Sequence, residues 1–323
     1  MPIDMHVHST KSGHASWKPK KIVNEIKKIE GIDGFALTDH DTGEGIEEAV
    51  KAGDKKDVVV VPGMEMCFKY SSKEGVLFEG EVLAYFIDPN YRLLERIVER
   101  CRESRENRDI TLFNLAKYKF EISLNESLDW AVKKDMISED KAGSWEKRGA
   151  PDRNILRKFL EDKGYLPKGK GHEIIKDPSS GLYVEREKTP LDEVSMAIYG
   201  AGGIPIFAHP GLTLQKEHVS FDCFKKFFLP VILDQGIMGF EIYPYHMVEK
   251  GVSEKTSTLW NIEFGKINID NDLINGVKGS DFHMPSYEVV KGKLTEKITL
   301  GRYVTSDYTF ERLKNEAMKN KSL

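Results

Sequence analysis

The sequence predicts an α/β fold of barrel type, on three observations. The chain has 323 residues, a length that barrels reach as one large domain or as one domain carrying an insertion. Short apolar runs alternate with amphipathic stretches towards both ends of the chain, which favours parallel strands joined by helices. Histidines and carboxylates follow several of these runs, and barrels gather ligand-binding side chains at the carboxyl ends of their strands.

The first ninety residues contain the first predicted elements. Apolar runs predict four strands, at Ile3–His8, Gly34–Thr38, Val58–Glu65 and Val76–Ile87. Amphipathic patterns predict two helices between the earlier strands, at Pro19–Ile29 and Gly45–Ala52. We therefore expect parallel βα units here, with His8, His40 and Glu65 at or just past a strand end.

Residues 91–187 have a different composition, which is charged and helical. Arg102, Arg105 and Arg108 recur at helical spacing, and Pro151–Lys163 has the pattern of an amphipathic helix. Lys168–Gly171 predicts a flexible turn, and no strong strand pattern occurs in this block. We interpret residues 91–187 as a helical insertion, or cap, between the barrel segments 1–90 and 188–323.

The barrel pattern resumes near Thr189 with a predicted helix. Three predicted strands follow, at Gly202–Pro210 with His209 near its end, at Gly239–Tyr243 and at Val277–Asp281. A short strand-like run and a closing helix complete the prediction, at Ile298–Val304 and Thr309–Lys319. The sequence shows no internal repeat.

Composition and charge restrict the possible partners. The formal net charge is −4, which argues against a large nucleic-acid surface, although a local basic pocket for a short anion remains compatible with it. No apolar run approaches the ~20 residues that span a bilayer. Met1 leads directly into a polar strand rather than a signal peptide, so we expect a cytoplasmic location and no membrane partner. The three cysteines are scattered and predict neither disulfides nor a thiolate zinc site.

Two short motifs of equal spacing bracket the chain, His6-Val7-His8 and Asp281-Phe282-His283. Side chains two residues apart in a strand emerge on one face, so each pair can direct two ligand atoms at one point. Further ligand-type residues end other apolar runs: Asp39, His40, Asp41, Glu65, His209 and Glu241. Imidazoles and carboxylates suit Mn, Fe or Zn, and more than four ligands predict more than one metal ion.

Five motifs in this order resemble those of the PHP (polymerase and histidinol phosphatase) superfamily. They are Asp4-Met5-His6-Val7-His8-Ser9, Thr38-Asp39-His40-Asp41-Thr42, Pro62-Gly63-Met64-Glu65, Ala208-His209-Pro210-Gly211 and Gly279-Ser280-Asp281-Phe282-His283. The resemblance implies a distorted (β/α)7 barrel with a trinuclear metal centre. It also implies a metal-dependent phosphoesterase, in which a metal-bound hydroxide attacks phosphorus.

The resemblance further implies roles for individual residues. His6, His8, Glu65 and Asp281 would hold one metal ion, while His40 and His283 would contribute to another. Glu65 would bridge towards a site containing His209. Three carboxylates would orient the ligand imidazoles: Asp4, Asp39 and Asp41.

Two departures from the family pattern affect the metal set. The family follows its first motif with Ser-Asp-Gly, whereas this chain has Ser12-Gly13-His14-Ala15, and it places a histidine where this chain has Glu81. Glu81 can serve as an oxygen ligand, and His14 is close enough in sequence to substitute for the missing aspartate. Two or three divalent ions are therefore expected, on the predicted ligands His6, His8, His40, Glu65, Glu81, His209, Asp281 and His283.

A narrower resemblance concerns the insertion, which is similar to that of PHP enzymes acting on nucleoside 3′,5′-bisphosphates and on the 5′ ends of short RNA. In that group the insertion supplies phosphate-binding arginines, which predicts this role for Arg105 and Arg108. Arg153, in Asp152-Arg153-Asn154, stands where the group has Arg-Pro-His. The alternative is a solvated helix with acidic neighbours as local partners, Glu103 and Glu106.

His246 follows a predicted strand end and is a candidate to contact substrate or to protonate a leaving oxygen. The predicted function is hydrolysis of a phosphomonoester or short nucleotide, with a small phosphorylated substrate as partner. Two alternatives are a histidinol-phosphatase-like enzyme on a small metabolite phosphate, and a metal-binding regulatory PHP module without catalysis.

Overall fold

The computed structural model describes most of the chain. The described residues are 1–12, 15–71, 77–134, 136–137, 139–242, 253–283, 286–290, 293–297 and 300–321. His14 and His246, two of the residues considered above, lie outside them. The chain divides into two compact units, Met1–Val98 with Thr189–Leu323, and Glu99–Lys188.

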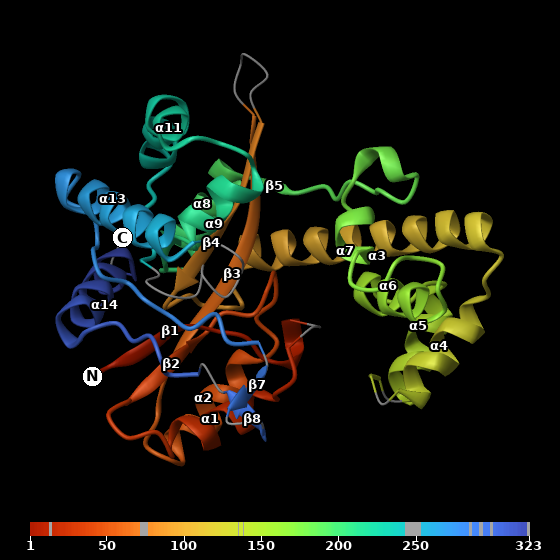
Figure 1. Cartoon of the computed structure of the whole chain (residues 1–323). Helices are drawn as coiled ribbons and strands as arrows, with labels where there is room; N and C mark the ends of the chain where they lie inside the picture. The colour runs from red at the N-terminus through yellow and green to blue at the C-terminus, as the bar shows by residue number, and fades with distance from the viewer. Residues whose placement is uncertain are drawn as a thin grey trace. The chain divides into compact units, whose positions relative to one another are not determined.

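A six-stranded mixed sheet forms the framework of the first unit (Figure 1). Its main path runs through β1 (Ile3–Val7), β2 (Gly34–Leu37), β3 (Val59–Ser71), β4 (Leu77–Tyr85) and β6 (Ile204–Phe207). The strands β1, β2 and β3 are parallel, whereas β4 is antiparallel to both β3 and β6. The two-residue strand β5 (Thr189–Pro190) pairs with β3.

Two irregular extended segments, residues 240–242 and residues 277–282, close this sheet into a barrel. The first follows β6, because Glu241 N–H donates to the Phe207 carbonyl at 2.9 Å. It is joined to the second segment by the Ile242 N–H, which donates to the Val277 carbonyl at 2.9 Å. The second segment returns to β1, where His8 N–H donates to the Phe282 carbonyl at 2.8 Å. With the five strands of the main path, this ring confirms the predicted distorted (β/α)7 barrel.

Both segments were predicted as strands but pair only through isolated bridges, Phe207 with Phe240 and Val7 with Phe282. Gly279 explains how closely the second segment approaches β1. A Cβ atom at this position would lie 2.4 Å from the backbone nitrogen of His6. Only glycine therefore permits the contact that closes the barrel.

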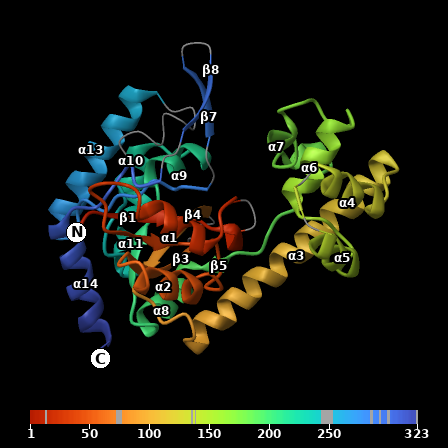
Figure 2. The ribbon, with the colours of Figure 1, turned by 90° about the horizontal axis from the view of Figure 1, so that it is seen from below.

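Helices accompany the sheet in the first unit (Figure 2). They are η1 (Thr10–Ser12), α1 (Pro19–Ile26), α2 (Ile46–Asp54), α8 (Leu191–Gly200), α9 (Pro210–Lys216), α10 (Phe221–Cys223), the π-helix η3 (Phe224–Phe228), α11 (Leu229–Asp234), α13 (Glu254–Asp270) and α14 (Asp307–Lys321). The helix α14 illustrates the amphipathic pattern: Phe310, Leu313 and Ala317 are buried at spacings of three and four. No described helix has the length and apolar character needed to cross a membrane.

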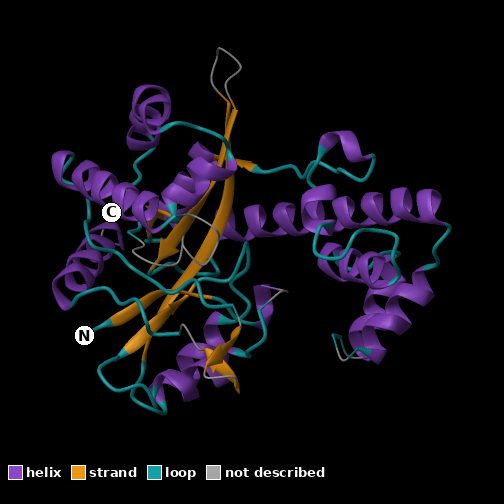
Figure 3. Ribbon diagram, in the orientation of Figure 1, coloured by secondary structure: helices purple, strands orange, loops and turns teal. Residues whose placement is uncertain are grey.

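The described residues of the second unit form helices and no strand (Figure 3). These helices are α3 (Arg92–Phe120), which begins in the first unit, α4 (Leu124–Lys133), α5 (Glu139–Arg148), α6 (Arg153–Asp162), α7 (Gly171–Ile174) and η2 (Pro178–Ser180). Three begin at side-chain caps: Ser123 accepts from Glu126 N–H, Asp152 from Asn154 N–H and Asp177 from Ser179 N–H. Phe113 and Phe159 belong to an apolar core of this unit alone.

Two predictions about the strands were wrong. The third and fourth predicted strands, β3 and β4, pair antiparallel instead of forming a parallel βα unit. Ile298–Val304 was predicted as a strand, but among its described residues 300–304 form turns and coil. A hairpin that the sequence analysis missed lies before it, made of β7 (Ser286–Val290) and β8 (Lys293–Lys297).

Candidate metal centre

Three imidazoles converge on one carboxylate oxygen in the barrel. Glu65 Oε2 lies 2.8 Å from His40 Nδ1, 3.2 Å from His8 Nε2 and 3.4 Å from His6 Nε2. Glu65, His6 and His8 are fully buried. Glu65 lies on β3 and His6 on β1, while His8 and His40 follow the ends of β1 and β2. The parallel pairing of these strands therefore brings the four residues together.

A second carboxylate faces the same imidazoles from the far end of the chain. Asp281 Oδ1 lies 3.2 Å from His8 Nε2, 3.5 Å from His6 Nε2 and 3.3 Å from His283 Nδ1. The ring of His283 stacks on that of His8, with centroids 4.1 Å apart. The two bracketing motifs therefore meet in one cluster, because the second closing segment lies against β1.

The other oxygen of Glu65 faces a separate group of ligand atoms. Glu65 Oε1 lies 2.9 Å from His209 Nε2, which is 3.3 Å from Glu81 Oε2. Groups whose ligand atoms all lie within 4.8 Å of one another are His6 with His8 and Asp281, His8 with His40 and His283, and His40 with Glu65 and Glu81. All eight predicted ligands thus lie in one connected cluster, with Glu65 between its two parts.

The position of Glu65 differs from the one the sequence predicted. It was expected at a strand end, but β3 continues to Ser71, and Glu65 lies beyond the end of the neighbouring strand β2. His40 pairs with Glu65 through an isolated parallel bridge. Glu81 lies on β4 opposite Cys67, and the Cys67 thiol is 3.6 Å from its Oε1. The antiparallel pairing of β3 and β4 therefore brings Glu81 to the cluster.

Backbone strain accumulates at this site. His209, Asp281 and Asp41 have φ angles of 26°, 48° and 47°, in the left-handed region that non-glycine residues rarely adopt. Such conformations persist where the surrounding structure enforces them, and they are common at functional sites. Here they turn the chain sharply where ligand-type side chains must face the barrel interior.

Glu241 and Ser12 fix the tautomers of the first histidines. Glu241 Oε1 lies 3.1 Å from His6 Nδ1, so this nitrogen carries the proton that the carboxylate accepts. Ser12 Oγ donates to Asp39 Oδ1 at 2.7 Å and therefore accepts from His8 Nδ1 at 3.0 Å. Both imidazoles consequently direct Nε2 towards Glu65 and Asp281.

Three aspartates that the resemblance assigned to imidazole orientation accept hydrogen bonds from other groups. Asp4 accepts from the backbone N–H groups of Ser280 at 2.8 Å and Gly301 at 2.7 Å, so it ties β1 to the second closing segment. Asp41 accepts from Cys67 N–H at 2.9 Å. Among the described residues, Asp39 is linked to His8 through Ser12. Ser12 was not predicted as a site residue, whereas Glu241 was singled out without this role.

The electrostatics of the cluster favour a bound cation. Burial alone would lower the pKa of His8, but the adjacent carboxylates of Asp281 and Glu65 outweigh burial and raise that pKa to about 9. Burial likewise acts against the charged form of Glu65, yet His40 and His6 hold its pKa well below the usual range. Ionised carboxylates therefore require positive charge at the Nε2 atoms of the histidines, where a metal ion can replace a proton.

The residues present fit divalent metal ions. Glu65 Oε2 is buried and accepts no well-directed hydrogen bond within the described part of the chain, although three imidazole nitrogens surround it. An oxygen in this position is satisfied by coordination to a cation rather than by a proton donor. Nitrogen and carboxylate donors around it are those that Mn, Fe and Zn accept.

Comparison with known proteins agrees with this geometry. The family model of the PHP domain matches residues 4–146, which include five of the eight predicted ligands. The chain is similar to the PHP family over these residues. Among curated proteins, this chain is 24% identical over 287 residues to a 3′,5′-nucleoside bisphosphate phosphatase of Chromobacterium violaceum, covering 88% of the chain and 87% of that protein. It is 22% identical over 294 residues to a 5′-3′ exoribonuclease of Haemophilus influenzae, covering 90% and 93%.

Solved structures share the fold of this protein. A structure named as a metal-dependent phosphoesterase of Bifidobacterium adolescentis superposes with a TM-score of 0.69 at 22% identity, over 97% of this chain and 96% of that one. An amidohydrolase of Chromobacterium violaceum with bound sulfate and no metal gives 0.67 at 20% identity, with the same coverage. The match to the PHP domain and the ligand set support an enzyme of the metal-dependent phosphoesterase class, as the sequence predicted.

The three predicted phosphate-binding arginines lie within the second unit, on helices α3 and α6. Arg105 and Arg108 are on α3, three residues apart, and Arg153 is the first residue of α6. Arg102, the first of the spaced arginines, instead forms surface ion pairs with Glu99 and Glu106. The solvated-helix interpretation therefore holds for Arg102, while Arg108 is largely buried.

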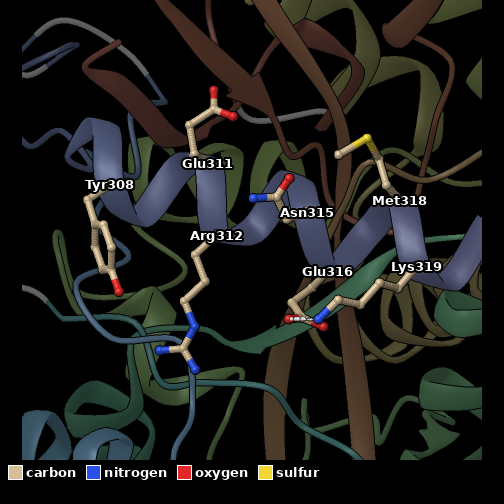
Figure 4. A pocket seen from close by; sticks show the side chains of 7 residues that line it. All are labelled: Tyr308, Glu311, Arg312, Asn315, Glu316, Met318 and Lys319. Carbon is tan, nitrogen blue, oxygen red and sulfur yellow. Dashed lines mark hydrogen bonds and ion pairs between the residues drawn. The ribbon is translucent and has the colours of Figure 1, made fainter.

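A surface hollow on the C-terminal helix contains none of the predicted ligands (Figure 4). One face of α14 lines it, through Tyr308, Glu311, Arg312, Asn315, Glu316, Met318 and Lys319. Glu316 pairs with Lys319, and Arg312 donates to backbone carbonyls of Leu273 and Asp272. These cations already have partners, and we do not place the functional site there.

Proposed function

We propose that this enzyme hydrolyses a phosphomonoester or a short nucleotide, either a nucleoside 3′,5′-bisphosphate or the 5′ end of a short RNA. The observation that carries the proposal is the position of Glu65, whose two oxygens face two groups of nitrogen and oxygen ligands. A bridging carboxylate of this kind suits a multinuclear site for phosphate chemistry. The named activities of the two curated relatives support a nucleotide as the substrate.

The chain's own residues would divide the work. His6, His8, Asp281, His40 and His283 would hold ions on one side of Glu65, and His209 with Glu81 would hold one on the other. Bound divalent ions, Mn, Fe or Zn, would lower the pKa of a water molecule and stabilise charge on phosphate oxygens. Glu241 and Ser12 keep the imidazoles aligned. Arginines of the second unit, Arg105, Arg108 and Arg153, would hold a phosphate group of the substrate.

A substrate screen with defined metal ions tests the proposal. Purified protein would be supplied in turn with Mn²⁺, Fe²⁺ or Zn²⁺ and given a nucleoside 3′,5′-bisphosphate, a short 5′-phosphorylated RNA, histidinol phosphate and an aryl phosphate. We expect the two nucleotide substrates to have the highest kcat/KM. A preference for histidinol phosphate would favour a small-metabolite phosphatase instead. Metal binding without turnover of any phosphoester would favour a regulatory module.

The His8→Ala, Asp281→Ala double variant is the matched control for this screen. It removes two ligands that meet at 3.2 Å, and it should abolish turnover of every substrate. Full activity in this variant would contradict the assignment of the metal centre. His218→Ala changes an exposed histidine outside the cluster and should leave turnover unchanged.

A further inference from the structure

The second unit places two arginines around one buried carboxylate. Asp109, on α3, is 2% exposed. Its Oδ1 accepts from Arg108 Nε at 3.1 Å and from Arg108 Nη2 at 2.7 Å. Its Oδ2 lies 3.6 Å from Arg148 Nη2. Each oxygen of Asp109 therefore faces a different guanidinium group, and the two groups come from helices α3 and α5.

These contacts hold both guanidinium groups in defined orientations. Adjacent residues on a helix do not ordinarily face each other, so the pairing of Arg108 with Asp109 draws the arginine side chain back along its own helix. Arg148 also donates to the Ala150 carbonyl from Nε at 3.2 Å and from Nη2 at 3.0 Å. The Trp145 ring lies 5.6 Å from its guanidinium carbon. Little rotational freedom remains to be lost when a ligand binds.

Arg153 is a third cation of this group, and its position disfavours positive charge. It is the first residue of α6, and the N-terminus of a helix disfavours positive charge. Burial lowers its pKa to about 10, and the nearby charges of Arg108 and Arg186 act in the same direction, against Asp109 and Asp152. Its Nε atom is buried and donates no hydrogen bond within the described residues. The electrostatics at this position are those of a site for an anion.

The charge balance indicates which anion would fit. Arg108, Arg148, Arg153 and Arg186 interact with Asp109 and Asp152, so positive groups outnumber negative ones by two. A phosphate dianion would balance this excess. Its tetrahedral oxygens also match the planar fork of a guanidinium group, which donates two parallel hydrogen bonds.

We propose that Asp109 is the positioning residue of a phosphate site in the second unit, and that Arg148 joins Arg108 and Arg153 in contacting the phosphate. The inference deepens the proposed function, on which its substrate rests. It assigns to Asp109 the alignment of Arg108 and Arg148, without contact to the ligand. It also extends the phosphate-binding set to Arg148, which no motif in the sequence indicated.

Binding of inorganic phosphate to the full-length protein tests the site without turnover. Isothermal titration would compare the wild type with Asp109→Asn, Arg148→Ala and the control Arg102→Ala, which changes an exposed arginine of the same helix α3. We expect Asp109→Asn and Arg148→Ala to bind phosphate about ten-fold more weakly, as for the loss of one charge-assisted hydrogen bond. Arg102→Ala should match the wild type. The metal centre is unchanged in all of these proteins, so differences between them report on the second unit.

Steady-state kinetics separates positioning from a purely structural role. On a nucleoside 3′,5′-bisphosphate, Asp109→Asn should raise KM about ten-fold and leave kcat unchanged, because only binding of the second phosphate is weakened. On an aryl phosphate, which has a single phosphate, both constants should equal those of the wild type. A structural defect would instead lower kcat on both substrates.

The outcomes also separate this inference from the proposed function. Wild-type phosphate affinity in a folded Arg148→Ala protein would overturn the inference, whatever the activity of the enzyme. Phosphate binding that depends on Arg148 in a protein that hydrolyses no phosphoester would uphold the anion site and reject the proposed function. If Asp109→Asn does not fold, as judged by circular dichroism, Arg148→Ala decides.

Discussion

The metal centre and the arginine cluster are both groups of charged side chains, but they differ in the sign of the charge that remains. Around Glu65 the buried carboxylates dominate, and the histidines become cationic only by holding extra protons. Around Asp109 the guanidinium groups dominate, and they cannot release their charge at ordinary pH. We therefore expect the first cluster to bind cations and the second to bind anions.

The two clusters share one principle of construction. In each, the atoms that would face the ligand are aligned by a residue that would not contact it. Glu241 fixes the ring of His6 through Nδ1, and Asp109 fixes the guanidinium of Arg108. Such partners set the direction of the ligand atoms before binding, which saves conformational entropy at the moment of binding.

Breaking the centre of the first cluster should have the largest effect. Glu65→Gln keeps the size of the side chain but removes the charge that both groups of ligands face. We expect kcat/KM to fall about a thousand-fold, because several kcal/mol of transition-state stabilisation depend on the metal ions. Metal content measured by plasma mass spectrometry should fall in parallel.

The control for this variant is Glu263→Gln, which changes a carboxylate on α13 that forms an ion pair with Lys266. It should retain the metal content and activity of the wild type. An active, metal-loaded Glu65→Gln protein would show that the two ligand groups do not depend on a shared carboxylate.

Breaking the second cluster should have a smaller and more selective effect. Arg153→Ala should raise KM for a nucleoside 3′,5′-bisphosphate by about ten- to hundred-fold, since hydrogen bonds to a charged group are lost. The same change removes a desolvated cation from a helix N-terminus, so the melting temperature without phosphate should stay the same or rise. A large loss of thermal stability would instead indicate that Arg153 serves the packing of the second unit.

The convergence of the candidate ligands was easier to predict from the sequence than the elements that carry them. His6 and His8, like Asp281 and His283, are spaced by two, and this spacing directs both side chains of a pair to one face whichever segment lies beside them. Glu65 was predicted at a strand end because the apolar run ends there, yet β3 continues through it. The antiparallel partner β4 extends the strand, and strand pairing is a property of distant sequence that periodicity does not encode.

The aligning residues were harder to predict for a related reason. Ser12 acts only because Asp39 takes its proton and His8 supplies another, so its role depends on three segments meeting. Asp109 likewise depends on α5, which contributes Arg148. A serine or aspartate in isolation has many ordinary roles at the surface or at helix caps. Only tertiary contacts distinguish these two from the rest.

The alignment of His6 by Glu241 can be weakened without removing a ligand. Glu241→Gln retains a hydrogen-bonding group at His6 Nδ1 and at the His209 backbone N–H, but it loses the negative charge. We expect metal affinity to fall by some tens of fold, within the range of about 10- to 100-fold typical of such partners. Competition with a metal-binding dye would measure it. Unchanged affinity would mean that barrel packing alone orients His6.

The smallest effect on the metal centre should come from a residue that holds Glu241 in place. Asn268 is fully buried on α13; its Oδ1 accepts from Phe240 N–H at 2.9 Å, and its Nδ2 donates to the Phe240 carbonyl at 3.0 Å. Asn268→Ala leaves both backbone groups without these partners, so the free energy of unfolding should fall by about 2 kcal/mol in urea denaturation of the metal-free protein. Metal affinity should fall only about three-fold, because Glu241 N–H still donates to Phe207 and retains most of the alignment.

The control is Asn271→Ala, at the end of the same helix, which removes one hydrogen bond to Ile267 and should leave metal affinity unchanged. Loss of stability without any loss of metal affinity would show that Glu241 is held by the strand bridge alone.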